Sequence, residues 1–200
     1  MANIASAEKI ERRKSDILDA AMEEFSANGF HKTGIADIAS RLNIGHGTIY
    51  RYYKNKREIF DAILQEGFSR LIKVVANNPP NADSFEEYLR QLKDISSSLN
   101  AFFVDDPRFV KIFFHQTASV DPKVLKRLKD MIALTTKEYL KNGVDKCFLR
   151  QSMNQTVASH MIATMLIEII IQIVDEEPLD VTLEEWTQEM LAIMINGISL

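Results

Sequence analysis

Three residue types on which many small folds depend are scarce in this sequence. A single cysteine, Cys147, stands among the 200 residues, so no disulfide can form within the chain, and a reducing compartment such as the cytoplasm is expected. Glycine occurs 7 times and proline 5 times, too seldom for the many turns of a strand-rich fold. The first residues become charged without an apolar stretch, so we expect no signal peptide.

Catalytic and metal-binding patterns are also missing. The four histidines, His31, His46, His115 and His160, are not spaced like metal ligands, and no carboxylate joins them in a short motif. No serine lies in a nucleophile elbow, and Cys147 has no partner base. We therefore predict that the protein is not an enzyme and carries neither a metal ion nor a cofactor.

Charge is distributed unevenly along the chain. The net charge of the whole is −4. Residues 1–57 hold 10 Lys and Arg against 7 Asp and Glu, a net charge of +3, whereas residues 58–200 hold 14 against 21, a net charge of −7. This asymmetry weakly favours contact with nucleic acid at the N-terminal end alone.

Apolar residues recur at helical spacing through most of the chain. Ile10, Ile17, Ala21 and Phe25 share one helical face in the first such segment. The predicted fold is therefore all-α, with about nine helices. Their expected ranges are about 7–28, 35–42, 46–53, 56–76, 84–103, 107–118, 122–141, 152–174 and 183–198.

Short motifs mark several predicted helix ends. Asn28-Gly29 and Asn142-Gly143 indicate helix stops, because both residue types tolerate left-handed backbone. Ser152, three residues before Gln155, predicts a capping box at the start of the helix over 152–174.

The segment 157–174 is apolar enough to be compared with a membrane span. His160, Glu168 and Gln172 interrupt it, and acidic residues follow it without a Lys or Arg anchor. A helix buried between a core and a partner subunit has the same composition. We therefore expect burial rather than membrane insertion.

The segment Thr33–Glu58, TGIADIASRLNIGHGTIYRYYKNKRE, contains two short helical patterns separated by a tight turn. The first ends at Leu42, and the second runs from His46 to about Tyr53. Two such helices have the geometry of a helix-turn-helix, whose second helix enters the DNA major groove. Asn43 occupies the turn position where we expect left-handed backbone, which Asn tolerates better than most residues.

The helix-turn-helix geometry predicts a role for each side of the second helix. Ile49 and Tyr53, four residues apart, are predicted to form the buried side of the second helix. Its other side would face DNA, where the fork of Arg51 reads guanine or meets phosphate, and Lys56 opens a helix whose free amides can bind phosphate. The predicted DNA-binding residues are Thr33, His46, Gly47, Thr48, Tyr50, Arg51, Tyr52 and Lys56.

The run GHGTIYRYYKNK over 45–56 resembles the signature of the TetR family of regulators, in which a Gly-Thr-hydrophobic-Tyr sequence precedes a lysine at the next helix. The preceding run over 20–44 resembles the family through its Phe-x-x-x-Gly-Phe and Ile-Ala elements, and the match covers about residues 10–65. Two departures stand out. Gly45 replaces a common serine, which removes a side-chain cap, and Gly34 replaces a common Thr or Ser, which removes a phosphate contact.

An aromatic cluster lies in the C-terminal part, with methionines and one acidic residue on a later helix. Core packing is one interpretation, and a ligand cavity between helices is the other. The resemblance favours the cavity, because proteins of that family usually bind an inducer there; Glu168 in the cavity would favour a cationic or hydrogen-bonding ligand. The candidate ligand-binding residues are Phe102, Phe103, Phe113, Phe114, Met161, Met165 and Glu168.

The last two predicted helices, over 152–174 and 183–198, are expected to form a homodimer surface with the same helices of a partner. The alternative is that they pack only within one chain. The candidate contact residues are Ile167, Ile170, Ile171, Val174, Trp186, Leu191 and Ile195.

Together these patterns predict a cytoplasmic, ligand-responsive transcriptional regulator, most simply a repressor. A helix-turn-helix domain over 1–55 would bind a pseudopalindromic operator in double-stranded DNA, and a helical domain over 56–200 would dimerise and bind a small-molecule inducer. Ligand would move the helix over 56–76 and alter the spacing of the two DNA-binding helices. Two other classes stay open: a DNA-organising or protein-interaction factor with a packed second domain, and an enzyme with activity in its C-terminal part.

Overall fold

The computed structural model describes residues 2–174, 185–186, 188–189 and 192–193. Its elements are all helical, which confirms the predicted fold class. In chain order they are α1 (Ala2–Asn28), α2 (Ile35–Arg41), α3 (His46–Ile49), α4 (Lys56–Ala76), α5 (Phe85–Asp105), α6 (Pro107–Lys111), the π-helical turn η1 (Ile112–Gln116), α7 (Thr117–Val120), α8 (Lys123–Asp145) and α9 (Gln155–Val174). The predicted helix over 183–198 falls mostly outside the described residues.

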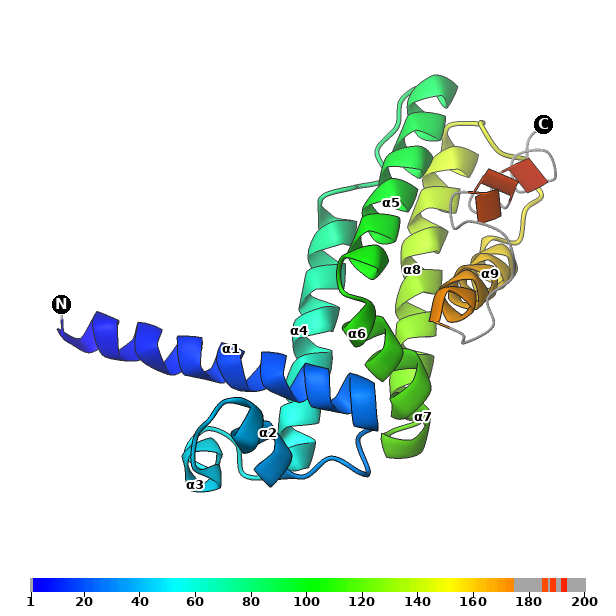
Figure 1. Ribbon diagram of the computed structural model, residues 1–200. Helices are drawn as coiled ribbons and strands as arrows, with labels where there is room; N and C mark the ends of the chain where they lie inside the picture. The colour runs from blue at the N-terminus through cyan, green and yellow to red at the C-terminus, as the bar shows by residue number, and fades with distance from the viewer. Residues whose placement is uncertain (1, 175–184, 187, 190–191, 194–200) are drawn as a thin grey trace.

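The N-terminal part is built on α1, which packs across α4 while α2 and α3 lie beneath it (Figure 1). Ile17, Phe25 and, on α2, Ile38 are fully buried in its core. Burial of a side chain of this size contributes about 1.5–3 kcal/mol. Ile10 shares the predicted face but is 43% exposed, because the N-terminal part of α1 projects beyond the other helices (Figure 1).

The long helix α4 joins the N-terminal part to the C-terminal bundle. The Asn55 side chain caps it by accepting a hydrogen bond from the Glu58 amide over 2.9 Å, and the Glu58 carboxylate accepts one from the Lys54 amide over 2.5 Å. These bonds satisfy amides that a helix start leaves unpaired. The buried residues of one continuous core extend from α1 through α4 to α9, so the two parts share packing.

The Phe109 ring packs directly against Gly67 where α6 meets α4. A Cβ atom built on Gly67 of α4 would lie 1.9 Å from the ring of Phe109. Real side chains cannot tolerate such a contact, so this crossing requires glycine. The predicted single helix over 107–118 is in fact α6, a π-helical turn and α7 in succession, and the Thr117 hydroxyl donates a hydrogen bond to the Phe113 carbonyl there.

The predicted stop at Asn142-Gly143 is wrong. The helix α8 continues to Asp145, and the chain reverses at Cys147, whose φ is 59°. Gly143 serves packing instead, since a Cβ there would lie 2.7 Å from the Leu149 side chain. An Asn-Gly pair can therefore either end a helix or allow close packing within one, and the sequence pattern is the same in both cases.

Two other helix ends can be compared with their predictions. The helix α1 ends at Asn28, and Gly29 follows with a φ of 83°, as predicted. The cap of α9 is not Ser152 but Asn154, whose side-chain oxygen accepts a hydrogen bond from the Val157 amide over 3.1 Å. Among the described residues no helix is long and apolar enough to cross a membrane.

Candidate nucleic-acid interface and ligand cavity

Backbone hydrogen bonds close the turn between α2 and α3. The Ile44 amide donates to the Ala39 carbonyl and the Asn43 amide to the Ser40 carbonyl, each over 3.0 Å. Asn43 has a φ of 52°, which confirms the left-handed conformation predicted for it. This short, fully bonded turn fixes the angle at which α3 leaves α2.

The helix α3 is shorter than predicted. It spans only His46–Ile49, and the chain then continues in tighter turns, with the Tyr52 and Tyr53 amides donating to the Ile49 carbonyl over 2.9 and 3.0 Å. The predicted buried side is confirmed: Ile49 is 0% and Tyr53 7% exposed. Burial, with a smaller effect of nearby carboxylates, raises the pKa of Tyr53 to about 12, so its hydroxyl remains neutral.

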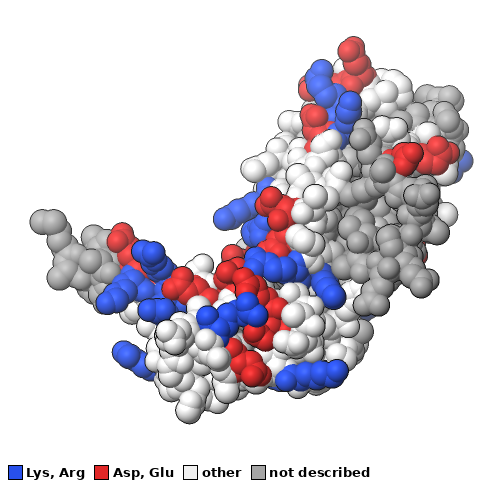
Figure 2. Space-filling model, in the orientation of Figure 1, with Lys and Arg blue, Asp and Glu red and all other residues white. Residues whose placement is uncertain are grey.

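The opposite side of α3 is open. His46, Gly47, Tyr50 and Arg51 are exposed and Thr48 is partly exposed. Within the part of the chain that the structure describes, none of their side chains has a hydrogen bond or an ion pair. A Cβ atom on Gly47 would meet nothing within 4 Å. In Figure 2 the surface over α2 and α3 is mostly uncharged, whereas acidic and basic side chains mix where α1 crosses the other helices.

Thr33 does not belong to this open face. It is 2% exposed, and its hydroxyl lies 2.9 Å from the Gly29 carbonyl and 3.3 Å from the Glu24 carbonyl. The hydroxyl fastens the loop between α1 and α2 to the end of α1. The expectation that Thr33 contacts DNA is corrected accordingly, and Tyr52, which is half-buried, lies at the edge of the face.

Lys56 is also engaged inside the protein. Its ammonium donates to the carbonyls of Phe30 over 2.6 Å and Thr33 over 2.7 Å, and lies 3.4 Å from the His31 carbonyl and 4.4 Å from the centre of the Phe30 ring. An ammonium group has three donors, and all three are used here. Lys56 therefore ties the loop after α1 to the start of α4, which corrects its predicted role as a phosphate ligand.

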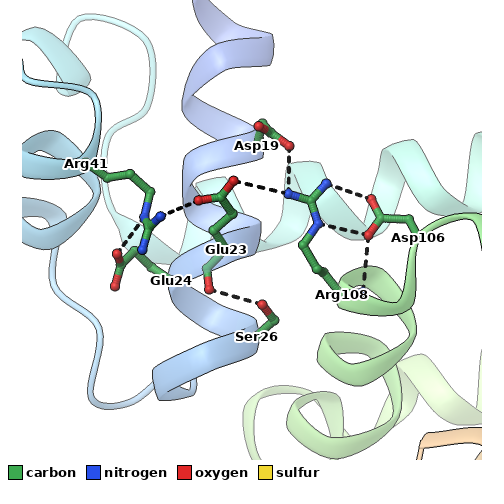
Figure 3. Close-up of polar contacts among 7 residues, drawn as sticks. All are labelled: Asp19, Glu23, Glu24, Ser26, Arg41, Asp106 and Arg108. Carbon is green, nitrogen blue, oxygen red and sulfur yellow. Dashed lines mark hydrogen bonds and ion pairs between the residues drawn. The ribbon is translucent and has the colours of Figure 1, made fainter.

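Arginines fix α1 to its neighbours on both sides (Figure 3). Arg41 of α2 donates to Glu24 over 2.7 Å and pairs with Glu23. These pairs are partly exposed, and such pairs contribute little energy singly. Their value lies in orientation, because a guanidinium held by two carboxylates sets the position of α2 against α1.

Arg108 of α6 makes the matching contact from the bundle. Its guanidinium lies 3.0 Å from Asp19 and 3.5 Å from Glu23, both on α1, and 3.0 Å from Asp106 (Figure 3). Burial pushes the pKa of Asp106 up, but the hydrogen bonds from Arg108 and two backbone amides outweigh burial and lower this pKa overall. Asp106 therefore stays ionised, and Glu23 lies between two guanidinium groups.

A second link to the bundle passes through Gln116 at the end of η1. Its side-chain amide donates to the Phe25 carbonyl over 2.5 Å, and its oxygen accepts from the Phe30 amide over 2.8 Å. Arg57 at the start of α4 donates to the Val120 carbonyl over 2.9 Å. Sequence reasoning missed these links, because a lone glutamine carries no signal for partners 86 and 91 residues away.

The phenylalanine cluster packs as core. Phe102, Phe103 and Phe113 are buried, and the space that they enclose with Phe109 and Leu128 is about 10 Å³, too small for more than one water. Phe114 is half-buried beside this cluster, and its ring centroid lies 5.3 Å from that of Phe113. Of the two interpretations of these aromatic residues, packing is the one that the geometry supports.

A larger cavity of about 90 Å³ lies between α4, α5, α8 and α9. None of the seven candidate ligand-binding residues lines it. No sequence signal pointed to it, because its walls come from four separate helices. The lining residues are Leu71, Val75, Leu92, Ile95, Ser96, Leu99, Met131, Ile132, Thr135, Thr136, Tyr139, Ile162 and Leu166.

Three candidate ligand residues lie on the outside of α9 instead. Met161 is 62% and Met165 37% exposed, and Glu168 is exposed as well. Their expected place in a cavity is corrected, because α9 turns this side away from the bundle core. The opposite side packs inward: Ile167 and Ile170 are 8% and 5% exposed, so the predicted dimer contacts at these two positions belong to the chain's own core.

The other predicted dimer contacts are only partly described. Ile171 and Trp186 are half-buried. The side chains of Val174, Leu191 and Ile195 lie outside the described residues. Among the described residues no group of three or more His, Cys, Asp or Glu could hold a metal ion.

Comparison with known proteins shows what the N-terminal part resembles. Residues 17–63 match the family model described as "Bacterial regulatory proteins, tetR family". The chain is also 37% identical over 57 residues to the fatty acid metabolism regulator protein of Bacillus subtilis strain 168. That alignment spans 28% of this chain and 29% of the relative, so this likeness concerns less than a third of either protein.

Solved structures extend the similarity to almost the whole chain. The fatty acid degradation regulator FadR from Bacillus halodurans superposes with a TM-score of 0.75 at 22% identity, covering 92% of this chain and 94% of that one. SmeT, the repressor of the Stenotrophomonas maltophilia multidrug efflux pump SmeDEF, superposes with a TM-score of 0.74 at 18% identity, covering 94% and 90%. At these identities the likeness shows the fold.

Proposed function

We propose that this chain is a regulator of the TetR type, a homodimeric repressor that leaves its operator when a small molecule binds; the family match over residues 17–63 and the similarity in fold support this proposal. The observation that carries the proposal is the outward face of α3. Ile49 anchors this helix in the core, while Tyr50 and Arg51, in the turn directly after it, are exposed and have no polar partner among the described residues. An exposed short helix held at a fixed angle is what entry into a major groove requires.

Each residue of the open face has a proposed part in DNA binding. The fork of Arg51 donates to a guanine edge or to phosphate, and Thr48 and Tyr50 donate to phosphate. Gly47 lets the α3 backbone approach DNA closely, and His46 at the helix start faces the same groove. Two such helices in a two-fold dimer would read the halves of a pseudopalindrome in successive major grooves.

The helix α4 is the proposed carrier of the ligand signal. Near its start, Lys56 and Arg57 hold the loop after α1 and the end of α7, and Leu71 and Val75 near its other end line the larger cavity. We place the functional boundary between domains 1–55 and 56–200 at its cap. A shift that lowers operator affinity about 100-fold needs only about 2.7 kcal/mol of differential ligand binding.

The proposed dimer surface is the outer face of α9 with the adjacent part of α8. Val157 is 54% exposed and Met161 62%, one helical turn apart, and Leu134 of α8 is 64% exposed. Exposed apolar residues mark association surfaces where they form a contiguous patch. The segment over 183–198 is the proposed second contributor to this surface.

Selection from random duplex DNA is the experiment that tests the proposal. Sequences enriched by the full-length protein should share a two-fold motif, and their affinity should fall steeply as salt is raised, because phosphate contacts release counterions. Tyr50→Phe should weaken binding at every salt concentration. Arg127→Ala on α8, which removes an exposed arginine far from α3 in the sequence, serves as the control.

The proposal would be refuted if the protein enriched no sequence and did not bind duplex DNA at low salt. The two other classes are less well supported. A DNA-organising factor without a ligand requires a packed second domain, yet the cavity is present. The proteins to which this chain is similar are regulators rather than enzymes. The sign of regulation can be measured with a reporter gene under the selected operator.

A further inference from the structure

The larger cavity is lined by uncharged residues. Nine of its thirteen lining residues are aliphatic or methionine, and the other four carry only hydroxyl groups. No Asp, Glu, Lys, Arg or His is among them. A charged ligand group held against these residues would therefore lose part of its hydration and find no counterion among them.

The four hydroxyl groups are not equivalent. Tyr139 donates to the Asn78 carbonyl in the loop between α4 and α5, and Thr136 donates to the Ile132 carbonyl over 2.8 Å. Ser96 of α5 and Thr135 of α8 have no hydrogen-bond partner within the described part of the chain. Each of these two hydroxyls can both donate and accept, so together they suit a hydroxyl or carbonyl group.

No hidden negative charge changes this picture. Tyr139 is buried, and burial together with Asp94 raises its pKa to about 12, so it is neutral under ordinary conditions. Glu168, the carboxylate from which a cationic ligand was expected, is exposed on α9 and does not line the cavity. The sequence favours a cationic or hydrogen-bonding ligand only if Glu168 lines the cavity, so the cationic alternative loses its support.

We propose that the cavity between α4, α5, α8 and α9 selects an uncharged, mainly aliphatic ligand with one hydroxyl or carbonyl group, which binds at Ser96 and Thr135. Ammonium and carboxylate compounds of the same chain length should bind more weakly. The regulatory meaning of this site rests on the proposed function, but ligand binding itself can be measured on the free protein without DNA.

Three probes of equal chain length separate the charge classes: hexanol, hexylammonium and hexanoate. Calorimetric titration of the full-length protein should show hexanol binding at least about tenfold more tightly than either ion. Equal or tighter binding of hexylammonium or hexanoate would overturn the proposal. Failure of hexanol to bind at all would overturn it as well.

Variants locate the hydrogen bonds. Ser96→Ala with Thr135→Val removes both hydroxyls at nearly constant shape and should weaken hexanol binding about tenfold. Ser97→Ala, the exposed neighbour on α5, should leave binding unchanged. Circular dichroism and the thermal unfolding midpoint show whether each variant folds. If the double variant is unstable, the single variant Ser96→Ala is used in its place. Unchanged hexanol affinity in a folded variant that lacks these hydroxyls would refute their role.

A second measurement distinguishes this inference from the proposed function. Hexanol is added to the protein bound to its selected operator. If hexanol binds the free protein but leaves the operator complex intact, the cavity inference stands and the inducer mechanism fails. If the protein binds its operator but no hexanol, the cavity inference fails and the DNA-binding function stands.

Discussion

The outer face of α3 and the seam between α1 and α6 use the same kinds of residue in opposite ways. In the seam Arg108 contacts three carboxylates, and outside it Lys56 of α4 donates to carbonyls of the loop after α1. In the turn after α3, Tyr50 and Arg51 are exposed and make no polar contact to any described residue. Polar groups whose hydrogen bonds are already made hold the fold together, whereas those left open are available to another molecule.

Two helical glycines give the strongest test of this contrast. Gly67→Ala should lower the free energy of unfolding by about 3 kcal/mol, because the added Cβ would collide with the Phe109 ring. Gly47→Ala on α3 should leave the free energy of unfolding within about 0.5 kcal/mol of the wild type or raise it slightly, because its Cβ would meet nothing. Urea unfolding followed by circular dichroism measures both.

For operator affinity, the two substitutions should rank in the opposite order. Gly47→Ala should reduce operator affinity, since the added methyl group lies between α3 and the groove. If Gly47→Ala destabilised the free protein as much as Gly67→Ala does, α3 would not be an open surface.

Two cationic residues sharpen the contrast further. Arg51→Ala should reduce operator affinity about 10- to 100-fold, the effect of losing a base-reading or strong phosphate contact, with the free energy of unfolding unchanged. Lys56→Met, which keeps the aliphatic stem, should lower the free energy of unfolding by about 1–3 kcal/mol, because three carbonyls lose their donor. Fluorescence anisotropy and urea unfolding measure the two effects separately.

An Arg51→Ala protein that unfolds more easily would show that Arg51 has an internal partner. A Lys56→Met protein of unchanged stability but weakened DNA binding would restore the phosphate role that the sequence predicted for this lysine.

Local patterns predicted the N-terminal part well, because its signals act over a few residues. Asn43 and Gly29 adopt the left-handed backbone expected at their turns, and Ile49 and Tyr53 are buried four residues apart. The roles of Thr33 and Lys56 could not be predicted in this way. Whether a polar group faces solvent or a backbone carbonyl depends on loops that only the folded chain brings together.

The bundle was predictable in its helices but not in its interior. Aromatic clustering suggested a cavity at Phe102 and Phe113, where large rings in fact fill the space. The larger cavity lies where medium-sized side chains of four helices meet, Ser96 and Thr135 among them. A cavity depends on how the surfaces of several helices fit together, so the residue pattern of one helix does not predict it.

Acid should weaken the seam before it affects α3. The pKa of Asp106 is lower in the folded protein than in the unfolded chain, so its contribution to stability is present at neutral pH and is lost as the pH falls through the folded value. The urea midpoint of the wild type should therefore fall between about pH 5 and pH 2 more steeply than that of Asp106→Asn, which keeps the cap of α6 but not the charge. Parallel curves would show that Asp106 does not couple to this seam.

The smallest expected effect is a gain at the start of α3. Gly45 caps this helix with an ordinary extended conformation, φ −67° and ψ 137°, and a Cβ there would meet no atom within 4 Å. Gly45→Ser should raise the free energy of unfolding by about 0.5–1 kcal/mol, because serine adds a cap acceptor and loses less chain entropy than glycine. Gly34→Ser is the matched control at the start of α2. Its Cβ would lie 3.3 Å from the Asp37 carboxylate that already binds the Gly34 amide, so its gain should be smaller. A larger gain from Gly34→Ser than from Gly45→Ser would contradict this prediction. It would mean that the start of α3, rather than that of α2, has little to gain from a side-chain cap.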